Sequence, residues 1–354
     1  MRYLLCISLA LALLAGSDLT MLAAMGSAAA AENPPNDDRC TEQGKPFSID
    51  SRIDACTAMI DSGQYKGKDL AWILVNRGNA WNAKHDLDRA ISDYSEAIRA
   101  DPKSSSAYNN RGSAYNLKRD YDRAISDYTE AISLAPDFAI AYNGRCLAHN
   151  NKGEADLALP DCNQAIALEP KDVLAYNNRG NAWRAKNELD RAIADYSEAI
   201  RIEPKYVTAY NNRGDAYGMK MDYEHAIADF SESIRLDPGN AEVFNARCWT
   251  RAIAGRELQQ ALADCGESLR LRPNEANTHD SLAFTHLKLG DLDRALAEYN
   301  TALGLNSRLP GSLYGRGIVE LRKGDATAAE MDIQAAKAIQ AGIADEFAKY
   351  GIAP

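Results

Sequence analysis

Basic side chains are the scarcer charge in this chain of 354 residues, with 40 lysines and arginines against 50 aspartates and glutamates. The net charge is -10 with the histidines neutral. A nucleic-acid-binding protein needs a basic stripe that displaces counterions from the phosphates, and attraction to anionic lipid also needs clustered basic residues. The charge balance therefore excludes nucleic acid as the main partner and disfavours a lipid surface.

Recognisable catalytic motifs are missing as well. The sequence has no HExxH, GxSxG or Walker loop, and no GxGxxG between a strand and a helix. Histidine occurs five times, and His149 and His286 fall at an aromatic core place of the repeat described below, which favours packing over catalysis. Metal-ligand spacings such as CxxC or a Cys/His set are absent too. We therefore expect no enzyme activity, no cofactor and no metal site.

Long apolar runs are scarce, and the one that stands out lies near the start of the sequence. Arg2 precedes an apolar stretch from Tyr3 to Ala15, and residues 29–31 are small alanines suited to cleavage before Glu32. The stretch of about 13 residues is shorter than the ~20 that a membrane-spanning helix needs. The pattern predicts a signal peptide over residues 1–31 rather than an anchor. The protein is then exported, with the periplasm as the expected compartment, secretion as the alternative, and no membrane insertion after cleavage.

Proline is rare, with 12 residues, but its spacing is regular. Steps of 34 residues separate Pro102, Pro136, Pro170, Pro204 and Pro238. A period of this length is typical of a solenoid, so one stack of repeats replaces the two or three domains that the length alone suggests. Within each period, apolar residues at helical spacing are interrupted once by a short polar turn, and the proline ends the second helix. Each repeat is therefore predicted to be a helix-turn-helix unit.

Aligned on this period, eight repeats begin at residues 71, 105, 139, 173, 207, 241, 276 and 310. Three positions are shared by repeats one, two, four and five: glycine at position eight (Gly78, Gly112, Gly180, Gly214), alanine at position twenty (Ala90, Ala124, Ala192, Ala226) and an aromatic residue at position twenty-four (Tyr94, Tyr128, Tyr196, Phe230). The small residues let two helices approach closely, and the aromatic ring fills the gap between neighbours. At these positions the sequence resembles the tetratricopeptide repeat family over residues 71–343.

The resemblance implies an all-α fold, a right-handed superhelical solenoid of tetratricopeptide helix-turn-helix repeats that binds protein or peptide partners. We expect a degenerate repeat or cap over residues 32–70 and the eight-repeat solenoid over 71–343. A capping segment over 344–354 completes the expected organisation, because the end units of a solenoid need a polar outer face.

Six cysteines lie beyond the signal segment and form three matched pairs: Cys40 with Cys56, Cys146 with Cys162, and Cys248 with Cys265. The separations are 16, 16 and 17, and the longer one belongs to repeat six, which carries an extra residue. Each pair occupies positions eight and twenty-four, which lie level with each other in a hairpin that turns near position sixteen. One disulfide would then replace one glycine-aromatic contact. Six free, buried cysteines are the alternative, but export and the threefold coincidence favour three disulfides.

A charge pair also follows the repeat. Position seven is arginine in Arg77, Arg111, Arg145, Arg179, Arg213, Arg247 and Arg316, and position twenty-three is aspartate in Asp93, Asp127, Asp161, Asp195, Asp229, Asp264 and Asp332. Repeat seven has Leu282 and Glu298 instead. Because an acid accompanies every arginine, a structural ion pair between packed helices is favoured over a basic ladder that binds phosphate or carboxylate ligands.

Asparagine recurs inside the first helices, although it is a poor helix former. It stands at position five in Asn109, Asn143, Asn177, Asn211 and Asn245, and at position six in Asn76, Asn110, Asn178 and Asn212. In the family that the sequence resembles, position five lines the concave surface. A carboxamide both donates and accepts, so a row of them matches the N–H and C=O groups of an extended peptide. Bonds between neighbouring helices are the alternative, and the sequence does not separate the two.

Toward the C-terminal half the expected groove becomes apolar. Position nine is Trp249, Phe284 and Ile318 in repeats six to eight, and Tyr314 stands at position five of repeat eight. Large apolar groups of this kind can anchor a protein partner. Irregular packing of the end repeats is the alternative.

These patterns together predict a non-catalytic protein- or peptide-binding scaffold of the cell envelope that holds an extended partner in an asparagine-lined concave groove. A structural subunit of an envelope assembly, secretion or polysaccharide-export complex, which contacts partners by its convex face, is the alternative. The identity of the partner and the oligomeric state do not follow from the repeats, because the repeat specifies the scaffold and not its cargo.

Overall fold

The computed structural model describes residues 38–41 and 47–353, so the signal segment expected over 1–31 lies outside the described part of the chain. Every regular element of the described residues is an α-helix. They divide into two compact units, one ending at Ala185 and the other beginning at Lys186, and each is described by itself. The prediction of an all-α fold built from paired helices is confirmed.

The helices of the first unit are α2 (Asp38–Thr41), α3 (Ile49–Asp61), α4 (Gly67–Ala83), α5 (Leu87–Ala100), α6 (Ser105–Leu117), α7 (Tyr121–Leu134), α8 (Ala139–Lys152), α9 (Ala155–Leu168) and α10 (Val173–Ala185). Those of the second unit are α11 (Leu189–Ile202), α12 (Val207–Met219), α13 (Tyr223–Leu236), α14 (Ala241–Ala254), α15 (Leu258–Leu271), α16 (Ala276–Leu289), α17 (Leu292–Leu305), α18 (Pro310–Lys323), α19 (Ala326–Ile339) and α20 (Ile343–Lys349). The first helices of repeats two to eight begin at the residues that open those repeats in the sequence alignment.

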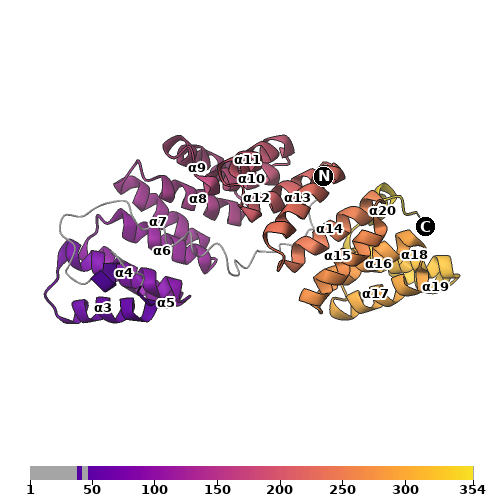
Figure 1. Cartoon of the computed structure of the whole chain (residues 1–354), viewed down its shortest axis with the longest axis horizontal. Coiled ribbons are helices and arrows are strands. Elements are labelled where there is room, and N and C mark those ends of the chain that lie inside the picture. Colours follow the sequence, from indigo (N-terminus) through magenta and orange to yellow (C-terminus); the bar gives the residue numbers. More distant parts are fainter. Residues whose placement is uncertain (1–37, 42–46, 354) are drawn as a thin grey trace. The chain divides into compact units, whose positions relative to one another are not determined.

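Consecutive helices pack as hairpins (Figure 1). In the first unit α4 packs with α5, α6 with α7 and α8 with α9, and in the second unit α12 packs with α13, α14 with α15, α16 with α17 and α18 with α19. First helices also contact each other, α4 with α6, α6 with α8, α14 with α16, and α16 with α18. Within each unit, the surface that these first helices share is called the first-helix face of that unit below.

Helix ends follow from local chemistry. Asp120 precedes α7 and accepts a hydrogen bond on Oδ1 from the backbone N–H of Arg123 at 3.3 Å, which satisfies one of the free donors of the first turn. The same N-cap is made by Asp86, Asp222, Asp291 and Asp325. At the other end, α7 stops at Leu134 and Pro136 stands two residues later, where it cannot continue the helix. In repeat two both ends of the second helix are therefore set by a local residue, an aspartate before it and a proline after it.

The turn between the two helices requires a left-handed backbone at position fifteen. Glycine supplies it in four repeats, as at Gly153 with a φ of 79° and Gly290 with a φ of 79°. The other four repeats force a side chain into this conformation: His85, Arg119, Asn187 and Met221 have φ values of 60–62°. Because left-handed backbone brings Cβ close to the following carbonyl oxygen, these four positions are strained.

Replacing Met221 by glycine is expected to raise the free energy of unfolding by about 0.5–1 kcal/mol, because the relief of strain exceeds the added freedom of the unfolded chain. Met221 is 57% exposed, so little packing is lost with its side chain. Urea unfolding followed by circular dichroism measures the change, and Gly153→Met is the reverse control, expected to destabilise. A lower stability of Met221→Gly would contradict a strained turn.

In repeats one, two and five the core of the hairpin depends on a glycine at position eight beside an aromatic residue at position twenty-four. A Cβ added to Gly78 would lie 2.5 Å from Cε1 of Tyr94, and one added to Gly214 would lie 2.8 Å from Cε1 of Phe230. Both distances are too short for any side chain, so position eight must stay small beside the ring. The tyrosine at position twenty-four is itself buried, and burial raises the pKa of Tyr94 far above its usual value.

Candidate functional site

The repeated arginines and aspartates form bidentate ion pairs in which the aspartate is buried and the arginine is partly buried. In repeat two, Nε and Nη2 of Arg111 donate to Oδ2 and Oδ1 of Asp127 at 2.8 and 2.7 Å. Equivalent pairs join Arg77 with Asp93, Arg145 with Asp161, Arg213 with Asp229, Arg247 with Asp264, and Arg316 with Asp332. The hydrogen bonds that Arg111 donates to Asp127 raise the pKa of the guanidinium. These arginines are engaged within the fold, as the structural interpretation predicted, and do not form a free basic ladder.

A third contact of each arginine links one repeat to the next, and the sequence analysis missed it. Nη1 of Arg111 donates to Oγ of Ser95 at 3.1 Å, and Ser95 lies on α5 of the preceding repeat. Ser95 donates its own hydroxyl hydrogen to the carbonyl of Ile91, so it accepts from the arginine. The equivalent acceptors are Thr57, Thr129, Asn163, Ser197, Ser231 and Asn300. The missed signal is a hydroxyl or amide at position twenty-five, one residue after the aromatic position.

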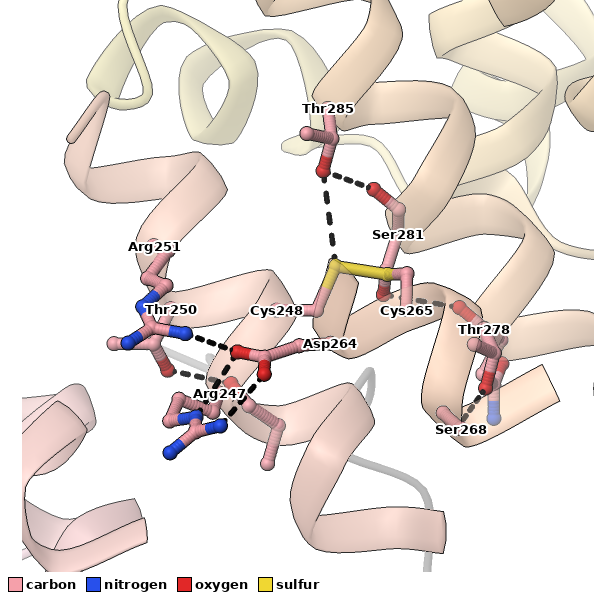
Figure 2. The surroundings of a disulfide bond; sticks show 12 residues. Arg247, Cys248, Thr250, Arg251, Asp264, Cys265, Ser268, Thr278, Ser281 and Thr285 are labelled. Carbon is pink, nitrogen blue, oxygen red and sulfur yellow. Dashed lines mark hydrogen bonds and ion pairs between the residues drawn. A yellow bond between two sulfur atoms is a disulfide. The ribbon is translucent and has the colours of Figure 1, made fainter. Parts of the chain in front are cut away.

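Repeat seven departs from this pattern in a consistent way. Leu282 replaces the arginine, and the preceding repeat has Gly266 where the others have the acceptor. Glu298 replaces the aspartate, and its Oε2 lies 2.6 Å from Nδ1 of His279. Asp264 of repeat six instead receives a second arginine, Arg251 (Figure 2). The arginine and its acceptor are therefore lost together at this junction.

Each of the three cysteine pairs is joined by a disulfide in the structure. The Cα–Cα distances are 4.9 Å for Cys40–Cys56, 5.4 Å for Cys146–Cys162 and 5.5 Å for Cys248–Cys265. All six side chains are fully buried. Figure 2 shows the Cys248–Cys265 bridge between α14 and α15, beside the Arg247–Asp264 pair that joins the same two helices. A buried bridge of this kind is a structural cross-link rather than an accessible redox centre.

Asparagines at position six bind neighbouring repeats. Nδ2 of Asn110 donates to Oδ1 of Asn79 at 2.9 Å, and Nδ2 of Asn178 donates to Oδ1 of Asn143 at 2.8 Å. In both cases the acceptor lies on the first helix of the preceding repeat. The backbone carbonyl of Asn178 also accepts from Nδ2 of Asn150 at 2.8 Å. For Asn110 and Asn178 the structure thus shows a packing role between first helices.

Three of the asparagines at position five, Asn109, Asn211 and Asn245, are different. Asn109 is 7% exposed, and its Nδ2 donates to Oδ1 of Asn110 at 3.1 Å, but its own Oδ1 is buried and has no partner among the described residues. The Oδ1 atoms of Asn211 and Asn245 are buried and unpartnered in the same sense. At Asn76, which stands at position six of repeat one, the unpartnered atom is Nδ2. Buried carboxamide atoms normally have a partner, so these recurring atoms need a donor or acceptor from water or a ligand.

The expected apolar anchor comprised Trp249, Phe284, Tyr314 and Ile318. The expectation of an open anchor is wrong, because Phe284 and Tyr314 are each 1% exposed and Ile318 is fully buried. The cover is α20 and the residues that follow it. The ring of Phe347 lies 4.8 Å from Tyr314, and the ring of Tyr350 lies 5.5 Å from Trp249, measured between centroids. Phe284, Tyr314 and Ile318 therefore belong to the core of the second unit, and Trp249, which is partly buried, packs against it.

Two ionisable groups lie close to this covered surface. Asp280 stands at position five of repeat seven, and burial raises its pKa to about 6 although the hydroxyl of Ser312 donates to it at 2.5 Å. Lys288 donates from Nζ to the backbone carbonyl of Tyr350 at 2.6 Å, and burial lowers the pKa of its ammonium. A cation at this carbonyl lies at the C-terminal end of α20, where the helix dipole favours positive charge.

Within residues 38–41 and 47–353, no helix has both the length and the apolar character needed to cross a membrane. The same residues contain no cluster of three or more His, Cys, Asp or Glu side chains that could hold a metal ion.

Comparison with known proteins identifies the repeat. A family profile described as TPR repeat matches residues 180–220, one described as tetratricopeptide repeat matches residues 105–138 and 207–240, and another of that description matches residues 282–344. The matches over 105–138 and 207–240 coincide with repeats two and five. None of the curated proteins compared with the chain matches it.

Several solved structures are similar in fold. PilW, a widely conserved type IV pilus biogenesis factor, has a TM-score of 0.56 at 16% identity, covering 60% of this chain and 98% of PilW. A tetratricopeptide repeat protein from Parabacteroides merdae has a TM-score of 0.54 at 20% identity, covering 67% and 92%. PilF of Pseudomonas aeruginosa has a TM-score of 0.52 at 18% identity, covering 59% and 94%. With its 34-residue period, its paired helices and these matches, the chain is a tetratricopeptide-repeat protein.

Proposed function

We propose that this chain is a non-catalytic scaffold that binds another protein and holds an extended segment of it on the first-helix face. The observation that supports this most directly is the unpartnered, buried Oδ1 at position five, in Asn109 of the first unit and in Asn211 and Asn245 of the second. Packing between repeats accounts for the position-six bonds of Asn110 and Asn178 but not for these oxygens.

The kind of hydrogen bond that a bound peptide can make follows from which atom of the position-five asparagine has no partner in the fold. Asn109 already uses its Nδ2 within the face, so its Oδ1 is the atom that can accept from a ligand. A peptide backbone in extended form presents N–H groups at regular intervals, and a carboxamide oxygen is a good acceptor for them. Recognition of this kind depends on the backbone of the partner and only weakly on its side chains.

The proposed location is the periplasm or another exported compartment. The support is the leader-like sequence over residues 1–31 together with three buried disulfides, which are rare in reducing compartments. In the proposed setting the partner is a protein of the cell envelope.

The test is a triple substitution, Asn109→Ala, Asn211→Ala and Asn245→Ala, in the full chain. Each lost hydrogen bond is worth about 1 kcal/mol, so partner recovery from an envelope extract is expected to fall by about tenfold or more. The thermal unfolding midpoint is expected to change little, because none of the removed oxygens has a partner in the fold. Quantitative mass spectrometry of crosslinked partners measures recovery.

A matched triple on the second helices provides the control. Glu130, Gln259 and Lys337 are exposed and lie on α7, α15 and α19, so their replacement by alanine leaves the first-helix face intact. The proposal would be rejected if the asparagine triple variant recovered as much partner as the wild type while the control triple variant lost it. That result would favour the alternative, a structural subunit that contacts its partners by the second-helix face.

A further inference from the structure

Helix α20 lies on the first-helix face of repeats six to eight, within the second unit (Figure 1). Phe347 packs on Phe284 and Tyr314 with ring centroids 5.6 and 4.8 Å away, and Tyr350 packs on Trp249 and Phe284 at 5.5 and 6.0 Å. Phe284 and Trp249 stand at position nine, and Tyr314 stands at position five. Tyr314 stands at the position that carries Asn109 in repeat two, and position nine lies one helical turn farther along the same helix face, so α20 lies where the proposed function places a bound segment.

We propose that this face of repeats six to eight is a binding site for a short amphipathic segment of another protein with two aromatic residues one helical turn apart, and that α20 is its displaceable internal occupant. The proposal rests on the proposed function in one respect, since Asn245 lies on α14 beside Trp249, and it extends that function to an apolar part of the face with a different partner chemistry. The template for the partner is α20 itself, because its Phe347 and Tyr350 are spaced i, i+3 and reach the same apolar side chains.

Several properties of α20 are those expected of a segment that can dissociate from the first-helix face. It has seven residues, and isolated helices shorter than about 12 are marginal in water. Its N-cap is Gly342, which has no side chain to cap the first turn, and Gly351 follows it with a φ of 74°. The side chain of Glu346 accepts from Gln340 and from the hydroxyl of Tyr350, and both bonds stay within the segment. The helix is therefore held mainly by its apolar contacts.

Lys288 adds polarity to the site. Its ammonium donates to the carbonyl of Tyr350 at the C-cap of α20, and it is half-buried. If α20 leaves, this cation lacks the carbonyl and can bind the C-terminal carbonyls of an incoming helical segment in the same way. The site thus combines an aromatic floor with one cation that fixes the direction of the occupant.

The test uses a fluorescent peptide of residues 341–353 as the probe and the full chain as the receptor. In Phe347→Ala/Tyr350→Ala the internal helix loses its aromatic contacts, and the probe is expected to bind about tenfold more tightly than to the wild type, since each aromatic contact is worth about 0.5–1.5 kcal/mol. The variant Asp345→Asn changes an exposed residue of α20 and is expected to behave as the wild type. Fluorescence anisotropy measures the affinity.

Two further arms locate the bound probe. A peptide with alanine at both aromatic positions is expected to bind neither the wild type nor Phe347→Ala/Tyr350→Ala, which is called the opened variant. Adding Lys288→Met to the opened variant is expected to weaken its binding of the probe. Equal binding of the alanine peptide, no effect of Lys288→Met, or no gain in the opened variant while its helicity is retained would each overturn the proposal.

If Phe347→Ala/Tyr350→Ala fails to fold, hydrogen exchange on the wild-type chain tests the proposal instead. The amides of α20 are expected to exchange at least about tenfold faster than those of α16 and α18, because a displaceable segment opens without global unfolding. Equal protection in all three helices would make α20 an integral part of the fold and overturn the proposal.

Discussion

Replacing Arg111 by methionine is expected to lower the free energy of unfolding by about 3 kcal/mol, because it leaves the Asp127 carboxylate buried without its partner. The side chain of Asp127 is 8% exposed and receives two hydrogen bonds from Arg111. The third bond, to Ser95 on the preceding repeat, is lost with them. Denaturant unfolding followed by circular dichroism measures the effect.

Two variants calibrate this expectation. Arg111→Met/Asp127→Leu removes both charges and is expected to be more stable than Arg111→Met alone, because no buried charge remains. Lys118→Met removes an exposed ion pair with Asp88, whose side chain is 83% exposed, and is expected to cost less than about 0.5 kcal/mol. An Arg111→Met variant as stable as Lys118→Met would contradict a buried, structural pair.

Removing one disulfide is expected to have an effect of similar size. Cys146→Ala/Cys162→Ala opens a cross-link of about 15 residues, which stabilises by roughly 3 kcal/mol through the entropy of the unfolded chain. Both side chains are fully buried, so the truncation also leaves unfilled space between α8 and α9. The comparison is made on oxidised protein by denaturant unfolding.

The chain offers its own control for this experiment. Repeat two carries Gly112 and Tyr128 at the positions of the cysteines, so Cys146→Gly/Cys162→Tyr rebuilds the packing of that repeat without the bridge. This variant is expected to recover part of the lost stability, because the ring fills the gap between the helices. Alkylation of cysteines in the oxidised, unfolded wild type would contradict the disulfides, and equal stability of wild type and double alanine variant would contradict their structural role.

Much of the hairpin could be predicted from the sequence because it depends on residues close along the chain. The partners Arg111 and Asp127 are 16 residues apart, and the turn between them brings their positions level in any helical hairpin. Cys146 and Cys162 follow the same rule. The acceptor Ser95 escaped notice because it lies across a junction between repeats, where the relative depth of two side chains depends on how the hairpins stack.

The asparagines show, within a single helix, the same limit on what the sequence predicts. Asn109 and Asn110 are adjacent and identical in composition, so the sequence could not separate a packing role from a binding role. Stacking shows the packing role of Asn110, since it brings Asn79 of the preceding first helix within reach, and it leaves the oxygen of Asn109 without a donor among the described residues. The binding role of Asn109 stays a proposal.

By itself the sequence determined the period, the helix ends and the pairs within each hairpin, because proline, N-cap aspartate and level positions act over one or two helices. It also determined that Trp249, Phe284, Tyr314 and Ile318 lie near each other on successive first helices. Only the tertiary structure decided that these side chains are covered. Phe347 lies 63 residues beyond Phe284 in the chain, and no repeat period relates the two. Their contact depends on the path by which α20 returns across the face, which is a long-range property of the packed chain.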